Sequence, residues 1–230
     1  MKKLNEGARI DRVRLLILDL DGTLADTIGS IRDAVNLAMN QYGYPERNYE
    51  EVRVAIGNGA RELIRLTMPA EESKDSALVD RVFADYHGFY GETYLHCDTC
   101  YEGIPESLAA LKERGYTLAV LSNKEDGYVK DLVKVLLPEG MISHAEGQTE
   151  KPIKPNPTVP LEIAASLGFA PEETAFLGDS EVDVMTGRNA GMLAVGCAWG
   201  YRNAACLEEA GADVRLEKPS EIADLFLSIG

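Results

Sequence analysis

The sequence lacks several features that would each point to a class of function. It holds no apolar run near the ~18 residues that a membrane span needs. Positive charge is scarce, because 23 Lys and Arg stand against 38 Asp and Glu, and the formal net charge is −15. This balance argues against binding to nucleic acid or to an anionic membrane, since both partners need a basic surface. The first residues, MKKLNEGARIDR, include no hydrophobic core of a secretory signal, so we expect a cytoplasmic protein.

Cysteine and histidine are also few, with four and three residues. Cys97 and Cys100 form a CxxC pair, which on its own is compatible with a redox pair or with half of a zinc site. No second CxxC and no paired-histidine motif accompanies it, so we expect reduced thiols. His87, His96 and His144 lie outside every motif described below, and we assign them no catalytic role.

The remaining sequence alternates short apolar runs with helical patterns. The runs, each followed by polar or turn residues, predict strands at 15–20, 117–121, 174–177 and 193–198. The helical patterns lie at 104–114, 129–137, 161–167 and 221–229. Short buried strands alternating with helices predict an α/β fold, a doubly wound parallel sheet of the Rossmann-like kind with helices on both faces.

Residues 26–97 interrupt this alternation. One helical stripe is formed by Ile28, Ile31, Val35, Ala38 and Tyr42, which are spaced by three and four residues. Further helices are predicted at 58–67 and 71–94, and no convincing strand lies between them. We therefore expect an inserted α-helical cap domain at 26–97 and a core domain at 1–25 and 98–230. The cap begins and ends near the first predicted strand, which is where a lid would lie.

That first strand runs into two acids, in the stretch LLILDLDGTLADT at 15–27. Asp19 and Asp21 are like charges at the edge of a core, and their repulsion and lost solvation have to be offset, for example by a cation. Open parallel sheets bind ligands beyond the carboxyl ends of their strands, so Asp19 is expected to face that crevice.

Other predicted strand ends also carry polar side chains. Ser122 lies in LSNK, Lys154 in KPNP, and Asp179 with Asp183 in GDSEVD. If a helix begins soon after Asp179, both of these acids face the same side. Several carboxylates, a lysine and a hydroxyl would suit a hard cation such as Mg²⁺ together with a phosphate group.

These motifs, in this order, resemble the haloacid dehalogenase-like hydrolases, a large family of magnesium-dependent phosphohydrolases. The resemblance rests on DLDGT, on Ser122, on Lys154 followed by Pro155 and Pro157, and on GDSEVD. It implies the family's fold and places the chain in the helical-cap group. The stretches GNGAR, YEGIPE and WGY are similar to the phosphoglycolate phosphatase branch.

The resemblance also implies roles for four residues. Asp19 would be the nucleophile that forms an aspartyl-phosphate, and Asp21 the general acid and then the general base. Ser122 would donate a hydrogen bond to the phosphoryl group, and Lys154 would pair with Asp19 and the phosphate. A family member with a second aspartate in this motif usually hydrolyses phosphate esters.

The same resemblance implies how Mg²⁺ would be held. Asp19 and Asp179 would bind the ion through their carboxylates, and Asp21 through its backbone carbonyl. Asp183 would contribute through water.

Six residues are candidates for contact with the substrate: Thr23, Asn123, Gly57, Asn58, Gly59 and Arg61. Thr23 would orient the loop, and Asn123 would supply a backbone amide. GNGAR is open to two interpretations. It can break one helix and start the next, or it can form a specificity loop in which Arg61 meets the far anionic end of the substrate.

The expected activity is magnesium-dependent hydrolysis of a small phosphorylated metabolite, with phosphoglycolate as the leading substrate. The alternatives are a phosphomutase such as a β-phosphoglucomutase, a pyrophosphatase or nucleotidase of the same family, and a non-enzymatic phosphate-binding signalling module. The stretch MISHAEGQT at 141–149 lacks the aromatic residues usual before the lysine loop, which weakens any transfer of a specific substrate. We expect a monomer or homodimer without a nucleic-acid or membrane partner.

Overall fold

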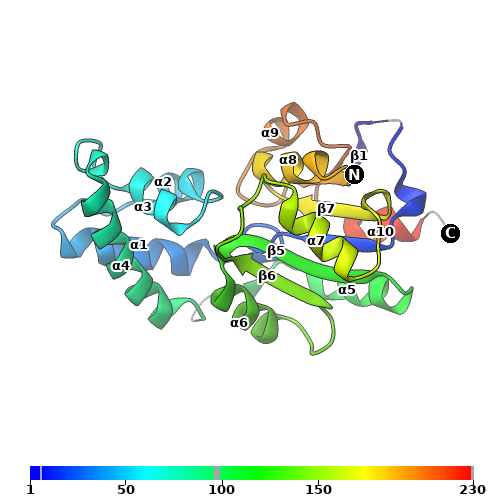
Figure 1. Cartoon of the computed structure of the whole chain (residues 1–230), viewed down its shortest axis with the longest axis horizontal. Coiled ribbons are helices and arrows are strands. Elements are labelled where there is room, and N and C mark those ends of the chain that lie inside the picture. Colours follow the sequence, from blue (N-terminus) through cyan, green and yellow to red (C-terminus); the bar gives the residue numbers. More distant parts are fainter. Residues whose placement is uncertain (6, 96–98, 229–230) are drawn as a thin grey trace.

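The computed structural model describes residues 1–5, 7–95 and 99–228, and at its centre is the apolar run that the sequence places before the two acids. This run is strand β2 (Leu15–Leu18), whose residues are all fully buried. Successive side chains of a strand point to opposite faces. Leu16 and Leu18 accordingly pack in one hydrophobic cluster, and Leu15 and Ile17 in another. Both faces of the sheet are therefore covered (Figure 1).

The sheet has seven strands in the order β1-β9-β8-β7-β2-β5-β6. The bounds are β1 Lys2–Lys3, β5 Thr117–Glu125, β6 His144–Gln148, β7 Thr174–Gly178, β8 Leu193–Cys197 and β9 Val214–Leu216. Among the described strand pairs of this sheet, the pairing of β1 with β9 is antiparallel and the other pairings are parallel. The predicted doubly wound, mostly parallel α/β fold is confirmed.

Two groups of helices cover the two faces. One group is α5 (Ile104–Glu113), α6 (Asp126–Leu136) and α10 (Glu221–Leu227), which pack on the side of Leu16. The other group is α7 (Thr158–Ser166), α8 (Glu181–Asn189) and α9 (Ala204–Glu209). Short 3₁₀ turns lie at Ile10–Arg12, Glu72–Lys74 and Pro171–Glu173. Among the residues that the structure describes, no helix has the length and apolar character needed to cross a membrane.

Four helices form a separate lobe beside the sheet (Figure 1). They are α1 (Ile28–Gln41), α2 (Tyr49–Ala55), α3 (Ala60–Thr67) and α4 (Ser76–Thr93). A two-stranded antiparallel ribbon of β3 (Ala25–Asp26) and β4 (Thr99–Cys100) joins the start of this segment to its end. Within the described residues, Tyr201 is the one fully buried member of the lobe's hydrophobic cluster that comes from outside it.

We propose that this lobe is the cap domain, residues 26–97, and that residues 1–25 and 98–230 are the core domain. The separate hydrophobic cluster of the lobe and the ribbon at its base support this division. Residues 97 and 98, at the second boundary, lie outside the described residues.

The observed elements differ from the predicted ones where local polar contacts decide the structure. The predicted helix at 71–94 begins only at Ser76, because the Asp75 side chain accepts the N–H groups of Ala77 and Leu78 and so caps the helix there. Strand β6 was not predicted, since its sequence HAEGQ carries no apolar run. Strand β5 continues four residues beyond the prediction, to Glu125, with a register shift after Leu121.

A pair of neighbouring positions on α3 tests the division into two domains. Ile64 is fully buried in the lobe, whereas Leu66 is 47% exposed. We expect Ile64→Ala to lower the free energy of unfolding by about 2–5 kcal/mol and Leu66→Ala by less than about 1 kcal/mol, as measured by urea unfolding. If the lobe is a cooperative unit of its own, Ile64→Ala will also lower hydrogen-exchange protection in α1–α4 more than in the sheet. An equal loss of protection in both parts would contradict the proposed division.

Candidate functional site

Three carboxylates meet at the carboxyl ends of neighbouring strands. Asp19 directly follows β2, Asp179 directly follows β7, and Asp183 lies in the first turn of α8. All three residues are buried, and one carboxylate oxygen of each lies within 4.8 Å of the others. Residues 160 positions apart therefore form one acidic cluster, as the strand-end motifs predicted.

The local sequence explains how Asp183 reaches this cluster. Ser180 is the N-cap of α8, and its hydroxyl donates to Asp183 Oδ2 at 2.6 Å. Gly178 ends β7, and a Cβ atom at that position would collide with the Asp183 side chain. The glycine and the capping serine together allow the helix to start close to the strand, with its first-turn acid pointing back at the sheet.

Lys154 supplies the positive charge inside the cluster. Its ammonium group donates to Asp19 Oδ1 at 2.7 Å and to Asp183 Oδ1 at 2.6 Å, and its side chain is only 3% exposed. Asn123 fixes the lysine loop, because its side chain accepts the Lys154 N–H and donates to the Lys154 carbonyl. The neighbouring Lys151 instead pairs with surface acids.

One lysine does not neutralise three buried acids. Burial raises the pKa of Asp19 to about 7, and the nearby carboxylates of Asp183 and Asp21 add to that rise, while Lys154 opposes it. Burial and the charges of Asp183 and Asp19 likewise raise the pKa of Asp179 well above its ordinary value. Burial opposes the charged form of Lys154, but Asp183 and Asp19 outweigh it and hold the pKa of Lys154 above its usual value.

This donor set fits a hard divalent cation. Carboxylate oxygens are the ligands that Mg²⁺ prefers, and a second positive charge would offset the like charges of the cluster. Asp183 has its Oδ1 bonded to Lys154 and its Oδ2 bonded to Ser180. Asp183 thereby orients Lys154, and together with Asp19 and Asp179 it offers carboxylate oxygens close enough to share one ion.

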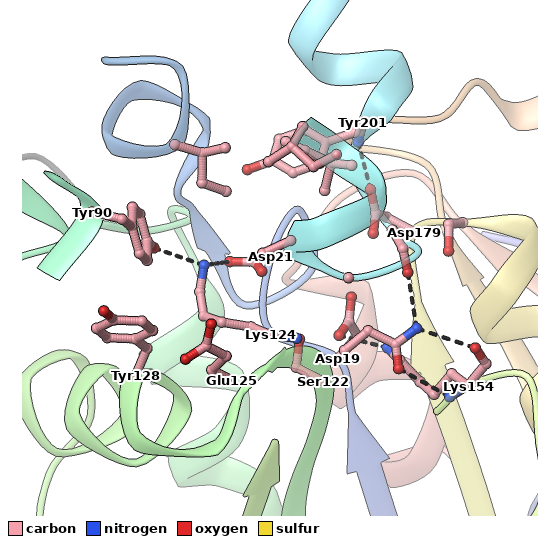
Figure 2. A pocket seen from close by; sticks show the side chains of 18 of the residues that line it. Asp19, Asp21, Tyr90, Ser122, Lys124, Glu125, Tyr128, Lys154, Asp179 and Tyr201 are labelled. Carbon is pink, nitrogen blue, oxygen red and sulfur yellow. Dashed lines mark hydrogen bonds and ion pairs between the residues drawn. The ribbon is translucent and has the colours of Figure 1, made fainter. Parts of the chain in front are cut away.

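Asp21 lies beside this cluster, on the side of the helical lobe. Its Oδ1 accepts a hydrogen bond from the Thr27 hydroxyl at 2.6 Å. The same oxygen pairs with Lys124 Nζ at 2.8 Å (Figure 2). The Thr27 backbone N–H donates to the hydroxyl of Tyr201. Tyr201 in turn donates its own N–H to Asp179. The two ends of the site are therefore linked through one tyrosine.

Lys124 is a residue that the sequence analysis missed. Its side chain is 6% exposed, and Nζ donates to the hydroxyl of Tyr90 in α4 at 2.7 Å (Figure 2). Ser122, which was predicted, is also buried and lines the same pocket. The available signal was spacing, since residues two apart on a strand point to the same side. Because Ser122 was expected to face the site, the same spacing predicts that Lys124 faces it too.

The pocket lies between the sheet and the helical lobe. Its lining from residues 26–97 consists of Ile31, Ile56, Gly57, Gly59, Ala60, Leu63, Tyr86 and Tyr90. The remaining lining residues are Asp19, Asp21, Ser122, Asn123, Lys124, Glu125, Tyr128, Lys154, Asp179, Ser180, Tyr201 and Arg202. The lobe thus contributes no charged side chain among the described lining residues.

The predicted substrate contacts are only partly found in this lining. Gly57 and Gly59 are present, and Asn123 lines the pocket while donating to the Gly57 carbonyl. The expected contact of Arg61 with a substrate anion is not supported, because its guanidinium is on the surface and donates to Asp80 and Ser76.

Two further candidates lie outside the lining. Asn58 is exposed and does not line the pocket. Thr23 is fully buried behind the pocket, where its hydroxyl donates to Asp179 Oδ1 at 3.3 Å. It therefore orients a carboxylate of the cluster, in keeping with a role in shaping the loop.

The thiols and imidazoles contribute no lining residue to the pocket, as far as they are described. Cys100 is half-buried, and burial with the charge of Glu106 raises the pKa of its thiol to about 11, which opposes thiolate reactivity. Cys97 and His96 lie outside the described residues. His87 pairs with Glu125 on the surface at 2.7 Å.

Comparison with known proteins identifies the family to which these motifs belong. A sequence model described as haloacid dehalogenase-like hydrolase matches residues 16–197. A phosphoglycolate phosphatase of Haemophilus influenzae is 32% identical over 206 residues, covering 87% of this chain and 92% of that protein. A phosphoglycolate phosphatase of Aquifex aeolicus is 30% identical and covers 93% of this chain and 97% of that protein.

Solved structures show the same architecture. The crystal structure of a predicted phosphoglycolate phosphatase from Haemophilus somnus has a TM-score of 0.86 and 25% sequence identity, and it covers 93% of this chain and 98% of that chain. A haloacid dehalogenase-like family protein from Streptococcus pneumoniae, at 20% identity, shares the fold with a TM-score of 0.84, covering 94% of this chain and 99% of that one.

The raised pKa of Asp19 makes a prediction for the protein in the absence of metal. Between pH 4 and pH 7 this carboxyl binds more protons when the chain is folded than when it is unfolded, so its contribution to stability is lost as the pH rises through about 7. Asp19→Asn removes this loss of stability, because the asparagine side chain does not ionise. In EDTA we expect the variant to be about 2–4 kcal/mol more stable than the wild type at pH 8, since one pKa unit is about 1.4 kcal/mol. At pH 5 the difference should be much smaller.

Urea unfolding across this pH range measures the effect. The surface variant Asp33→Asn, in which an exposed acid is changed, serves as the control. A stability advantage of Asp19→Asn that grows toward low pH would contradict the assigned burial of a charged carboxylate.

Proposed function

This chain belongs to the haloacid dehalogenase-like hydrolase family, and from that premise we propose that it is a Mg²⁺-dependent phosphatase of small phosphomonoesters, with phosphoglycolate as the leading substrate. The observation that carries the proposal is the buried contact of Lys154 with Asp19 inside the carboxylate cluster. The similarity to phosphoglycolate phosphatases over most of the chain supports the choice of substrate.

Asp19 is the nucleophile in this proposal. One of its carboxylate oxygens attacks phosphorus, the bond from phosphorus to the leaving oxygen breaks, and an aspartyl-phosphate forms. Lys154 donates to the same carboxylate and is positioned to balance the negative charge of the transferring phosphoryl group. Ser122, buried on the neighbouring strand, supplies a hydroxyl for a phosphoryl oxygen.

Asp21 is the general acid and then the general base in this proposal. In its protonated form it gives that proton to the departing oxygen of the substrate, and it then takes a proton from the water that attacks the aspartyl-phosphate. This second step restores the carboxylate of Asp19 and releases inorganic phosphate. The Thr27 hydroxyl and the Lys124 ammonium, both bonded to Asp21 Oδ1, hold the carboxyl group in place.

Asp19 and Asp179 would hold Mg²⁺ through their carboxylates, and the backbone carbonyl of Asp21 would be a further ligand. When bound, the ion would neutralise negative charge on the phosphate and on the acids around it. Asp183, whose oxygens bond to Lys154 and Ser180, would contribute to the metal site through water. Gly57 and Gly59, where the lobe meets the pocket, would leave space for a small substrate.

The first test changes the nucleophile. Asp19→Asn keeps the shape of the side chain but removes the attacking charge, so we expect the fold to persist and the turnover number to fall by about 10³-fold or more. Release of inorganic phosphate is measured with phosphoglycolate, sugar phosphates, nucleotides, phosphoserine and pyrophosphate. Asp33→Asn, on the surface of α1, is expected to keep wild-type turnover. Near-normal hydrolysis by Asp19→Asn would refute the assignment, and conversion of glucose 1-phosphate to its isomer would indicate a mutase instead.

The second test removes the metal. Chelation of divalent ions is expected to abolish phosphate release, and added Mg²⁺ is expected to restore it. Asp179→Asn should raise the Mg²⁺ concentration needed for half-maximal activity, because one of two direct carboxylate ligands is lost. Activity that persists after complete chelation would mean that the cluster does not serve a metal-dependent reaction.

A further inference from the structure

The lining of the pocket raises the question of which residue meets the organic part of the substrate. The lobe that covers the pocket contributes apolar side chains, glycines and two tyrosines. Such a surface can enclose a small leaving group but offers no charge to an anion. A second anionic group on the substrate must therefore be met from the core domain.

Among the described lining residues, three side chains are cationic, and they differ in their surroundings. Lys154 is bonded to Asp19 and Asp183 within the cluster. Arg202 donates to the carbonyls of Arg53 and Ile56 and pairs with Glu181.

Lys124 also has partners, Asp21 and Tyr90, but its position differs from that of the other two cations. Nζ lies 2.8 Å from Asp21 Oδ1 and 4.8 Å from the centre of the Tyr90 ring, on the side of the pocket that faces the lobe (Figure 2). It is thus beside the proposed proton donor and on the far side of the pocket from Lys154.

This position matches the chemistry of one class of leaving group. The oxygen that leaves phosphorus has to contact Asp21 in order to be protonated. In the phosphate ester of a 2-hydroxy acid, a single methylene or methine carbon separates that oxygen from a carboxylate. A cation bonded to Asp21 is therefore within reach of the carboxylate.

We propose that Lys124 is a specificity-determining residue that binds the carboxylate of the leaving group, so that the enzyme selects phosphate esters of short 2-hydroxy acids. Tyr90 positions the ammonium by accepting its hydrogen bond from the lobe. The role expected for Arg61 from the sequence is thereby assigned to a core lysine. This inference rests on the proposed phosphatase function and names the substrate class of the same site.

A pair of substrates that differ only in charge tests the inference. Phosphoglycolate is compared with its neutral amide, in which the carboxylate is replaced by a carboxamide. A hydrogen bond to a charged group corresponds to about 10- to 150-fold in binding, so we expect the wild type to prefer phosphoglycolate by about this factor in kcat/KM. Lys124→Met should reduce the preference to near one, mainly by raising KM for phosphoglycolate, and Lys124→Arg should retain part of it.

The controls separate specificity from other roles of the lysine. Lys130→Met, an exposed lysine on the following helix, should leave the preference unchanged. Equal losses on both substrates in Lys124→Met would overturn the inference and indicate that Lys124 only positions Asp21. A wild type that hydrolyses both substrates alike would also overturn it, even if Lys124→Met fails to fold. A wild type that releases phosphate from no phosphomonoester would instead refute the proposed function.

Discussion

The ammonium group of Lys154, held between Asp19 and Asp183, is the contact on which the arrangement of the site depends. It joins the end of β2 to the first turn of α8, and it is almost fully buried. Removing Lys154 would leave the buried carboxylates of Asp19 and Asp183 without their counterion, which typically costs several kcal/mol. The side chain of Asn123 bonds to the backbone N–H and carbonyl of Lys154 and so fixes the loop that delivers it. The end of β2, the loop that carries Lys154 and the first turn of α8 are thus held in fixed positions relative to one another.

Contacts between the lobe and the core use backbone carbonyls to a large extent. Arg202 donates to the carbonyls of Arg53 and Ile56 at the end of α2, and Asn123 donates to that of Gly57. Arg53 donates in return to the carbonyl of Tyr201. A hydrogen bond of this kind contributes about 1 kcal/mol net, so the set stabilises the covered pocket by only a few kcal/mol.

Sequence reasoning found the parts of the site that follow from strand order and missed those that depend on contacts across the fold. Asp19 was predictable because an apolar run directly precedes it and strand ends share one edge of a parallel sheet. The surface pairing of Arg61 was not predictable, since its partner Asp80 lies on another helix of the lobe. In the sequence, each of the two residues looks like an ordinary exposed charge. Lys124 was missed because the predicted strand ended at residue 121, and a lysine beyond the end of a strand is usually solvated. Its burial depends on Tyr90 of α4, which lies against it in the folded structure and is distant in the sequence. The edge strand β6, HAEGQ, is half-exposed and lacks the apolar periodicity that the central strands have.

In the proposed reaction, the charges around the pocket would couple metal binding to phosphate binding. The acidic lining residues are Asp19, Asp21, Glu125 and Asp179, and the basic ones are Lys124, Lys154 and Arg202. With all of them ionised, the lining carries one more negative than positive charge, and Asp183 lies just behind it. A phosphate dianion would be repelled by such a pocket, whereas a bound divalent cation would offset the negative charge of the lining and of Asp183. In the proposed reaction each ligand would therefore favour the other, and by linkage the coupling free energy would be the same in both directions. Such coupling would let a chain of net charge −15 hold an anionic substrate, because a cation and two lysines would act locally at the pocket.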